Sequence, residues 1–262
     1  MLTVFDTAPY VAGVLSVGGV GVVISRRREL ILRWATWAVT APLLGAAMLL
    51  GRPGAAALAT GLALAGLLEY RRLVRLPIPD TIVVAVALTA TIVTAGAPRV
   101  LAVAALAVVL TPVLAGDGVN GAARSAYAVL GFAWLATLTG LVTLGDAALP
   151  LFVAVSLADV AAWCCGKAFG GPRLSPLSPG KRWLGVLGGA LAGIGTLAVC
   201  DALTPALIIA VVVGAPLGDL LESMLKRGAG VKDAGTWLPG FGGLLDRIDS
   251  LLIALALAVI LS

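Results

Sequence analysis

Residues 215–250 read APLGDLLESMLKRGAGVKDAGTWLPGFGGLLDRIDS, and the rest of the chain resembles a scaffold around this stretch. Nine ionisable residues fall within 31 positions here, from Asp219 to Asp249. Elsewhere charged residues are sparse and mostly mark the ends of apolar segments. We therefore expect the polar chemistry of the molecule to be concentrated in this stretch.

Helical spacing predicts how these side chains are presented. A helix over residues 217–227 would place four polar side chains on one face, at positions i, i+3, i+4 and i+7: Asp219, Glu222, Ser223 and Lys226. A helix from Gly243 onward would place Asp246 and Asp249 one turn apart. The two helix ends would then present carboxylates toward each other, joined by a glycine-rich loop with basic side chains. Such an arrangement suits a divalent metal ion and a polyphosphate.

The composition determines the class of protein. Of 262 residues, 60% are hydrophobic and only 12% are charged, whereas soluble domains carry about 25% charged residues. The apolar runs are continuous and rich in Ala, Leu and Val, without the alternation of a transmembrane β-barrel. We therefore predict an all-α fold, a polytopic integral membrane protein with about eight to ten transmembrane helices.

The basic residues predict the orientation of these helices. We expect apolar spans near residues 10–25, 31–50, 54–70, 80–97, 100–115, 126–144, 148–165, 185–203, 205–222 and 244–262. Links after the odd-numbered spans hold most of the Lys and Arg residues, whereas the alternate links hold only Arg52 and Arg99. Because Lys and Arg concentrate on the cytoplasmic side of bacterial membranes, the odd links are predicted to be cytoplasmic. The protein is thus expected to be a multi-pass protein of the inner (cytoplasmic) membrane.

Two of the cytoplasmic links are long and hold all four lysines of the chain. They suggest a division into an amino-terminal scaffold of transmembrane helices, residues 1–145, and a carboxy-terminal catalytic region, residues 146–262. In the latter, the cytoplasmic loops would cover residues 166–184 and 223–245. The chain contains no histidine, which excludes histidine-based catalytic triads and most zinc sites.

Several residues outside the main stretch carry weaker expectations. Asp159 lies in a predicted span, where placing a carboxylate in the membrane costs free energy. Asp159 is therefore a candidate functional residue. Glu69 could pair locally with the arginines that follow it, and Asp80 and Asp117 are expected to be solvated at span ends. Glycines four positions apart, at Gly185, Gly189 and Gly193, predict close packing against a neighbouring helix.

The main stretch resembles the carboxy-terminal signature of the phosphatidate cytidylyltransferases (CDP-diacylglycerol synthases), S-x-x-K-R-x4-K-D-x-G-x2-L-P-G-H-G-G-x2-D-R-x-D. The matching residues are Ser223, Lys226, Arg227, Lys232, Asp233, Gly235, Leu238, Pro239, Gly240, Gly242, Gly243, Asp246, Arg247 and Asp249. Upstream, three shorter family segments are similar to Gly218–Ser223, to Asp159 and the residues up to Gly170, and to a turn with Ser178, Pro179 and Lys181. The sequence departs from the family pattern at Phe241, where the family has His, and at Leu184, where it has Glu.

The resemblance implies an enzyme that moves CMP from CTP to phosphatidate, giving CDP-diacylglycerol and pyrophosphate for phospholipid synthesis, with Mg²⁺ as cofactor. It implies metal ligands at Asp219, Asp246 and Asp249. Catalytic roles would fall on Asp219, Lys226, Arg227, Asp246 and Arg247. Substrate binding would involve Asp159, Ser178, Lys181, Glu222, Ser223, Lys232 and Asp233.

Two alternatives stay open at this point. A CTP-dependent lipid-alcohol kinase would need a base for its hydroxyl nucleophile and would release CDP instead of pyrophosphate. A catalytically inactive membrane relative would be consistent with the residues at Phe241 and Leu184. Expected partners are CTP and phosphatidate in the membrane, with no nucleic acid; a homodimer is a further alternative.

Overall fold

The structure is a computed structural model that describes residues 16, 40, 42–231, 234–235 and 242–262. Most of the first two expected spans lies outside the described residues. The same holds for Lys232 and Asp233 of the predicted site and for Phe241.

Helices dominate the described part of the chain, as the composition predicts. Residues 42–49 are helical and lead into α3 (Gly51–Leu73), and seven further helical segments follow. These are α4 (Ile78–Val93), α5 (Pro98–Leu114), α6 (Gly121–Ala136) continued through η1 (Thr137–Thr139) into α7 (Gly140–Thr143), α8 (Ala148–Phe169) after η2 (Gly145–Ala147), α9 (Trp183–Val199), α10 (Pro205–Ile209) continued through the π-helical η3 (Ala210–Gly214) into α11 (Ala215–Gly228), and α12 (Leu245–Leu261). Each segment overlaps one of the last eight predicted spans.

Within the described residues, three helical stretches are long and apolar enough to cross a membrane: Gly121–Thr143, Gly145–Phe169 and Pro205–Gly228. Ile78–Val93, Pro98–Leu114 and Trp183–Val199 are shorter apolar helices. Many large apolar side chains point outward, including Leu114, Leu191 and Val199, which are 86%, 73% and 80% exposed. An outer surface of this kind is stable against lipid and not against water, which makes this a membrane protein.

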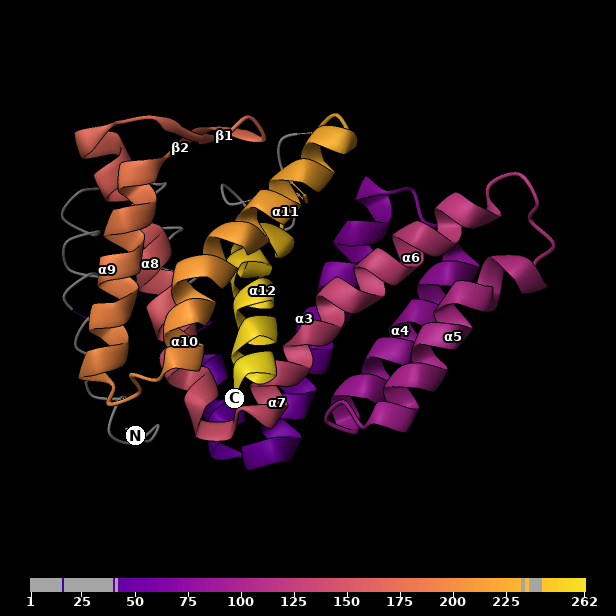
Figure 1. Ribbon diagram of the computed structural model, residues 1–262. Helices are drawn as coiled ribbons and strands as arrows, with labels where there is room; N and C mark the ends of the chain where they lie inside the picture. Colours follow the sequence, from indigo (N-terminus) through magenta and orange to yellow (C-terminus); the bar gives the residue numbers. More distant parts are fainter. Residues whose placement is uncertain (1–15, 17–39, 41, 232–233, 236–241) are drawn as a thin grey trace.

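The links between helices lie at two opposite ends of the molecule. Figure 1 shows the α3–α4, α5–α6 and α8–α9 links and the carboxy-terminal end of α11 at one end, at the top of the view. The α4–α5 and α9–α10 links lie with the carboxy terminus at the other end. The three links of the first set, and the end of α11, are the positions that the charge pattern groups together. The described part of the chain therefore alternates between two faces as the basic residues predict.

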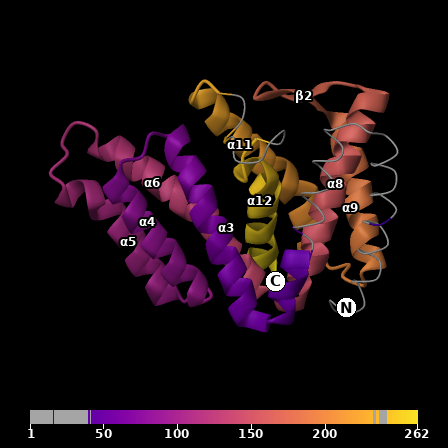
Figure 2. The same ribbon diagram turned by 180° about the vertical axis from the view of Figure 1, so that it is seen from behind.

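Helix α12 lies between two groups of helices. Figures 1 and 2 show α3 to α6 on one side of it and α8 to α11 on the other. Its buried side chains Leu245, Leu252 and Leu255 belong to the same core as Leu67 and Tyr70 of α3. Although α12 ends the chain, it is the element on which both groups pack.

Helices α8 and α9 pack closely through glycine, as predicted. A Cβ atom on Gly185 would lie 2.6 Å from the carbonyl oxygen of Ala162, and one on Gly189 would lie 2.8 Å from that of Ala158. The missing side chains allow the two backbones to approach.

The α8–α9 link contains an antiparallel hairpin that the sequence did not lead us to predict. Strands β1 (Arg173–Ser175) and β2 (Ser178–Arg182) pair Arg173 with Arg182 and Ser175 with Ser178. The hairpin extends over the end of the molecule where α11 and α12 meet (Figure 1).

Asp80 is not solvated, contrary to expectation. Its side chain is fully buried, and both of its oxygens accept N–H groups of Arg124 at 2.8 Å. Arg124 also donates to Asp117 at 2.7 Å. The ion pairs connect the starts of α4 and α6 to the link between α5 and α6, and they hold the hydrogen-bonded Asp117 carboxyl at a pKa below its ordinary value.

Candidate active site at the start of helix α12

The site forms because α11 and α12 touch without intervening side chains. A Cβ atom on Gly214 would lie 2.7 Å from Cα of Ala254, and one on Gly218 would lie 2.2 Å from the carbonyl oxygen of Asp249. Glycine at these two positions allows backbone contact between the helices. The residue that follows Gly218 is therefore placed beside the carboxylate of Asp249.

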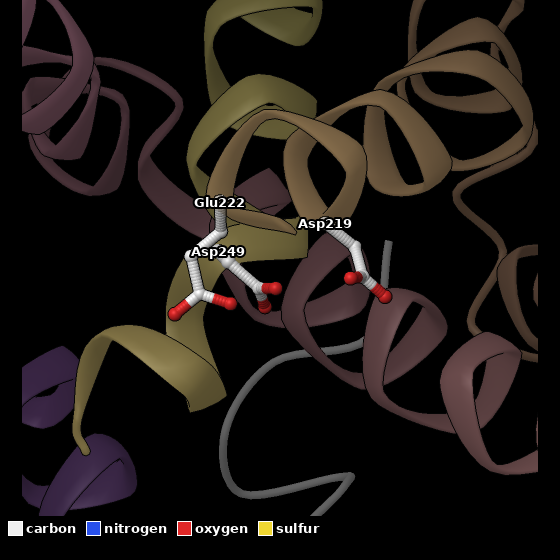
Figure 3. A group of neighbouring side chains, drawn as sticks. All are labelled: Asp219, Glu222 and Asp249. Carbon is white, nitrogen blue, oxygen red and sulfur yellow. The ribbon is translucent and has the colours of Figure 1, made fainter. Parts of the chain in front are cut away.

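Three carboxylates meet at this crossing. One oxygen each from Asp219, Glu222 and Asp249 lies within 4.8 Å of the other two. Figure 3 shows the three side chains directed to the same side, two from α11 and one from α12. Glu222 and Asp249 are buried, while Asp219 is partly exposed. Three carboxylates at this separation match the oxygen donors that a divalent cation prefers.

Asp246 lies next to this group but is held differently. Its Oδ1 atom accepts a hydrogen bond from Lys226 at 2.7 Å, and its Oδ2 atom accepts the backbone N–H groups of Ala234 and Gly243 at 3.0 and 2.7 Å. Lys226 also donates to Glu222 at 2.5 Å. Asp246 thus ties the glycine-rich link to α12, and Lys226 joins the two helices.

Glu69 of α3 enters the site from the amino-terminal half of the chain. Its carboxylate does not pair with the arginines that follow it in the sequence, contrary to expectation. It accepts hydrogen bonds from the backbone N–H groups of Leu244 and Leu245, at 2.9 and 2.8 Å. Its side chain is almost completely buried. An acidic residue in an apolar span is a signal for such a role, but nothing in the sequence indicates a partner 175 positions away.

Asp219, Glu222, Asp246 and Asp249 line one wall of a cavity of about 940 Å³. The cavity lies between α8, α9, α11 and the hairpin. Asp159 and Ser178 also line it, as does Lys181, which forms an ion pair with Asp219. Burial lowers the pKa of Lys181, and the carboxylates of Asp249 and Asp159 oppose this shift. Asp159 accepts a hydrogen bond from Ser250 at 3.3 Å, so α8 is joined to α12. Small and apolar residues complete the walls, among them Ala158, Ala162, Val186, Gly189, Val211 and Ala215.

The remaining predicted residues lie around the cluster. Ser223 is buried and donates a long hydrogen bond of 3.5 Å to Asp219. Arg227 is exposed and donates to the carbonyl oxygen of Val231 at 3.4 Å, and Arg247 is exposed on the first turn of α12. The structure thus gathers Asp219, Glu222 and Lys226 with the acidic residues of α12, and leaves the two arginines at the periphery.

The charge balance of the cluster favours a cation. If every ionisable side chain that lines the cavity is charged, five carboxylates (Asp159, Asp219, Glu222, Asp246 and Asp249) face four basic side chains (Lys167, Lys181, Arg182 and Lys226), which leaves −1. The Oε1 atom of Glu222 is buried and accepts no hydrogen bond from the described residues. Since a buried polar atom without a partner is unstable, this oxygen fits a metal ligand.

Comparison with known proteins agrees with the geometry. A model of the cytidylyltransferase family matches residues 31–262. The phosphatidate cytidylyltransferase of Brucella suis is 44% identical over 116 residues, 41% of this chain and 43% of that protein. That of Haemophilus influenzae is 43% identical over 118 residues, 40% and 41% of the two chains. A chloroplastic phosphatidate cytidylyltransferase of Arabidopsis thaliana is 40% identical over 116 residues, 41% of this chain and 29% of the plant protein.

The aligned stretches thus span less than half the length of these curated relatives, whereas the family match covers nearly the whole chain. It includes both α11 and α12, on which the three carboxylates lie. The chain therefore belongs to the cytidylyltransferase family.

Proposed function

We propose that this protein transfers CMP from CTP to phosphatidate, producing CDP-diacylglycerol and pyrophosphate. The observation that carries the proposal is the convergence of Asp219, Glu222 and Asp249 at one end of a cavity in a membrane protein. Family membership and the names of the relatives support the choice of reaction.

The reaction suits a site without histidine. A phosphate oxygen of phosphatidate attacks the α-phosphorus of CTP, a new P–O bond forms, and the bond to the bridging oxygen of the β-phosphate breaks. Pyrophosphate leaves with that electron pair. The nucleophile is already an anion near neutral pH, so no residue has to remove a proton from it. The barrier comes from crowded negative charge, which positioning and electrostatic neutralisation lower.

Asp219, Glu222 and Asp249 would hold the metal ion, for which we propose Mg²⁺. When bound, it would neutralise phosphate charge and orient the triphosphate. We propose Glu222 as a ligand in place of Asp246, because Asp246 is engaged by Lys226 and two backbone N–H groups. Asp246 would instead fix the link that precedes α12.

The basic side chains would bind the phosphates. Lys181 lies on a hairpin that borders the cavity, where it can exchange its contact with Asp219 for a phosphate oxygen. Lys226 would keep Glu222 and Asp246 in place and add positive charge beneath the triphosphate. Arg227 and Arg247 would act at the periphery, Ser178 and Asp159 would shape the cavity walls, and Ser223 would support Asp219 through its hydrogen bond. Lys232 and Asp233 keep the substrate-binding role that the resemblance implies.

We further propose that all eight helical segments of the described residues cross the membrane, with the site facing the cytoplasm. The positive-inside distribution supports this orientation, because the arginine- and lysine-rich links share one end of the molecule. CTP would then reach the site from the side on which nucleotides are made. In this arrangement residues 1–145 form the scaffold and residues 146–262 carry the catalytic groups.

The test uses purified protein in detergent with CTP, Mg²⁺ and either phosphatidate or a polyprenol. We expect pyrophosphate to be released in the reaction with phosphatidate and not in the reaction with polyprenol. CDP release with polyprenol would identify a lipid-alcohol kinase, and the absence of both products would identify an inactive relative. Either of those outcomes would overturn the proposal.

A further inference from the structure

Glu69 is an acidic residue buried near the cytoplasmic end of α3, outside the cluster that faces the cavity. Glu69 is 2% exposed, on a helix whose neighbouring residues Leu67 and Leu73 belong to the apolar core. A carboxylate in such a place is unstable unless hydrogen-bond donors compensate for the lost water.

The donors come from the start of α12. Oε1 accepts the N–H of Leu244 at 2.9 Å and Oε2 accepts that of Leu245 at 2.8 Å. The first N–H groups of a helix have no partner within the helix, and the helix dipole favours a negative charge at this point. Glu69 therefore caps α12 with a side chain from another helix.

The glycine-rich link is shaped to fit this carboxylate. A Cβ atom on Gly235 would lie 2.6 Å from Oε1 of Glu69, and a Cβ atom on Gly243 would lie 2.4 Å from Oε2. Backbone at two points of the link thus packs directly on Glu69. A side chain at either position would meet the carboxylate, which would have to shift.

The capped turn is the one that carries the acidic residues. The N–H of Gly243, next to the capped Leu244, donates to Asp246, and Asp249 follows one turn later. A shift of Leu244 and Leu245 would move both carboxylates relative to Asp219 and Glu222 of α11.

We infer that Glu69 is a positioning residue that fixes the first turn of α12, so that Asp249 completes the acidic site with Asp219 and Glu222. The inference rests on the proposed function, because it assumes that these three carboxylates bind a divalent metal. It makes the amino-terminal scaffold part of the active-site geometry.

The test measures metal affinity instead of turnover, by Mn²⁺ binding to purified protein followed by electron paramagnetic resonance. Glu69→Gln keeps the size of the side chain but turns an NH₂ group toward a backbone donor, so we expect Mn²⁺ affinity to fall roughly 10- to 100-fold. The matched control is Asp80→Asn, which removes a buried carboxylate from the same half of the chain without touching α12. Its Mn²⁺ affinity should equal that of the wild type.

A second variant covers the case in which Glu69→Gln does not fold. In Gly235→Ala the new methyl group displaces the carboxylate of Glu69 and leaves all charges in place. We expect the Mn²⁺ affinity of this variant to fall as well. Unchanged Mn²⁺ affinity in both variants, or an equal loss in Asp80→Asn, would overturn the inference. If Asp249→Asn binds Mn²⁺ as the wild type does, the metal site itself is wrong, and the failure lies with the proposed function.

Discussion

Two groups of carboxylates lie at the same end of this molecule, and they differ in how their charge is satisfied. At the start of α4, Asp80 receives two hydrogen bonds from one guanidinium group, and Asp117 takes a third. At the α11–α12 crossing, Asp219, Glu222 and Asp249 face one another, and one oxygen of Glu222 accepts no hydrogen bond from the described residues.

The difference shows which group is structural and which can bind a ligand. A bidentate arginine–carboxylate pair engages both oxygens of the carboxylate, as at Asp80. Ionised carboxylates whose oxygens lie within 4.8 Å of one another repel, and a cation bound between them would remove this repulsion. We call Asp80 and Asp117 the closed cluster, because each of their carboxylate oxygens accepts a hydrogen bond. We call Asp219, Glu222 and Asp249 the open cluster, because Oε1 of Glu222 accepts none from the described residues. The closed cluster holds helices together, and the open cluster has the features that our proposed cation site requires.

Removing a carboxylate from the open cluster should have the largest effect. We expect Asp249→Asn to lower pyrophosphate release by roughly 10³-fold or more, because it removes a proposed ligand of the metal ion that would neutralise the phosphate charge. The measurement is pyrophosphate release over a range of Mg²⁺ concentrations. Wild-type turnover in this variant would contradict the division between the two clusters.

Removing a carboxylate from the closed cluster should instead affect stability. Asp80→Asn leaves the buried end of Arg124 without its bidentate partner, and we expect the midpoint of thermal unfolding in detergent to fall by about 10 °C. Turnover per folded molecule should stay at the wild-type level. A loss of turnover that exceeds the loss of folded protein would show that the two clusters are coupled.

Separating α11 from α12 tests whether close packing maintains the open cluster. A methyl group in Gly218→Ala would meet the carbonyl oxygen of Asp249 and push the helices apart. We expect turnover to fall about tenfold and the unfolding midpoint to fall by a few degrees, which corresponds to overpacking of about 1–3 kcal/mol. Gly228→Ala, on the same helix but facing open space, is the matched control and should behave as wild type.

The sequence predicted much of this arrangement because the relevant signals are local. Continuous apolar runs predicted the helices, and spacing on one helix face predicted that Asp219, Glu222 and Lys226 would act together. The glycines of α9 predicted close helix packing, which the structure confirms at Gly185 and Gly189.

The remaining features depend on contacts between residues far apart in the chain. Lys226 reaches Asp246 across 20 positions, so Asp246 is occupied and Glu222 is the carboxylate with an open oxygen. Asp80 can be buried because it pairs with Arg124, which lies 44 positions later in the sequence. Glu69 accepts a hydrogen bond from a residue 175 positions later. Charge and hydropathy along the chain could not reveal these pairings.

The smallest expected effect concerns Asp117, the outermost member of the closed cluster. A hydrogen bond from Arg124 and the N–H group of Asn120 keep the pKa of Asp117 below its usual value, so its charge stabilises the folded state. For a depressed pKa, this contribution is present above the unfolded-state pKa of about 3.9 and is lost as the pH falls through the lower folded-state pKa. We expect Asp117→Asn to unfold about 1–2 °C below the wild type at pH 7, since exposed ion pairs contribute little. The two unfolding midpoints should begin to converge below about pH 4 and should meet once the pH is below the lower folded-state pKa, where the wild-type carboxyl is neutral in both states. If the difference in unfolding midpoint between wild type and Asp117→Asn persisted at pH 2, the contribution of Asp117 to stability would come from the shape of its side chain and not from its charge.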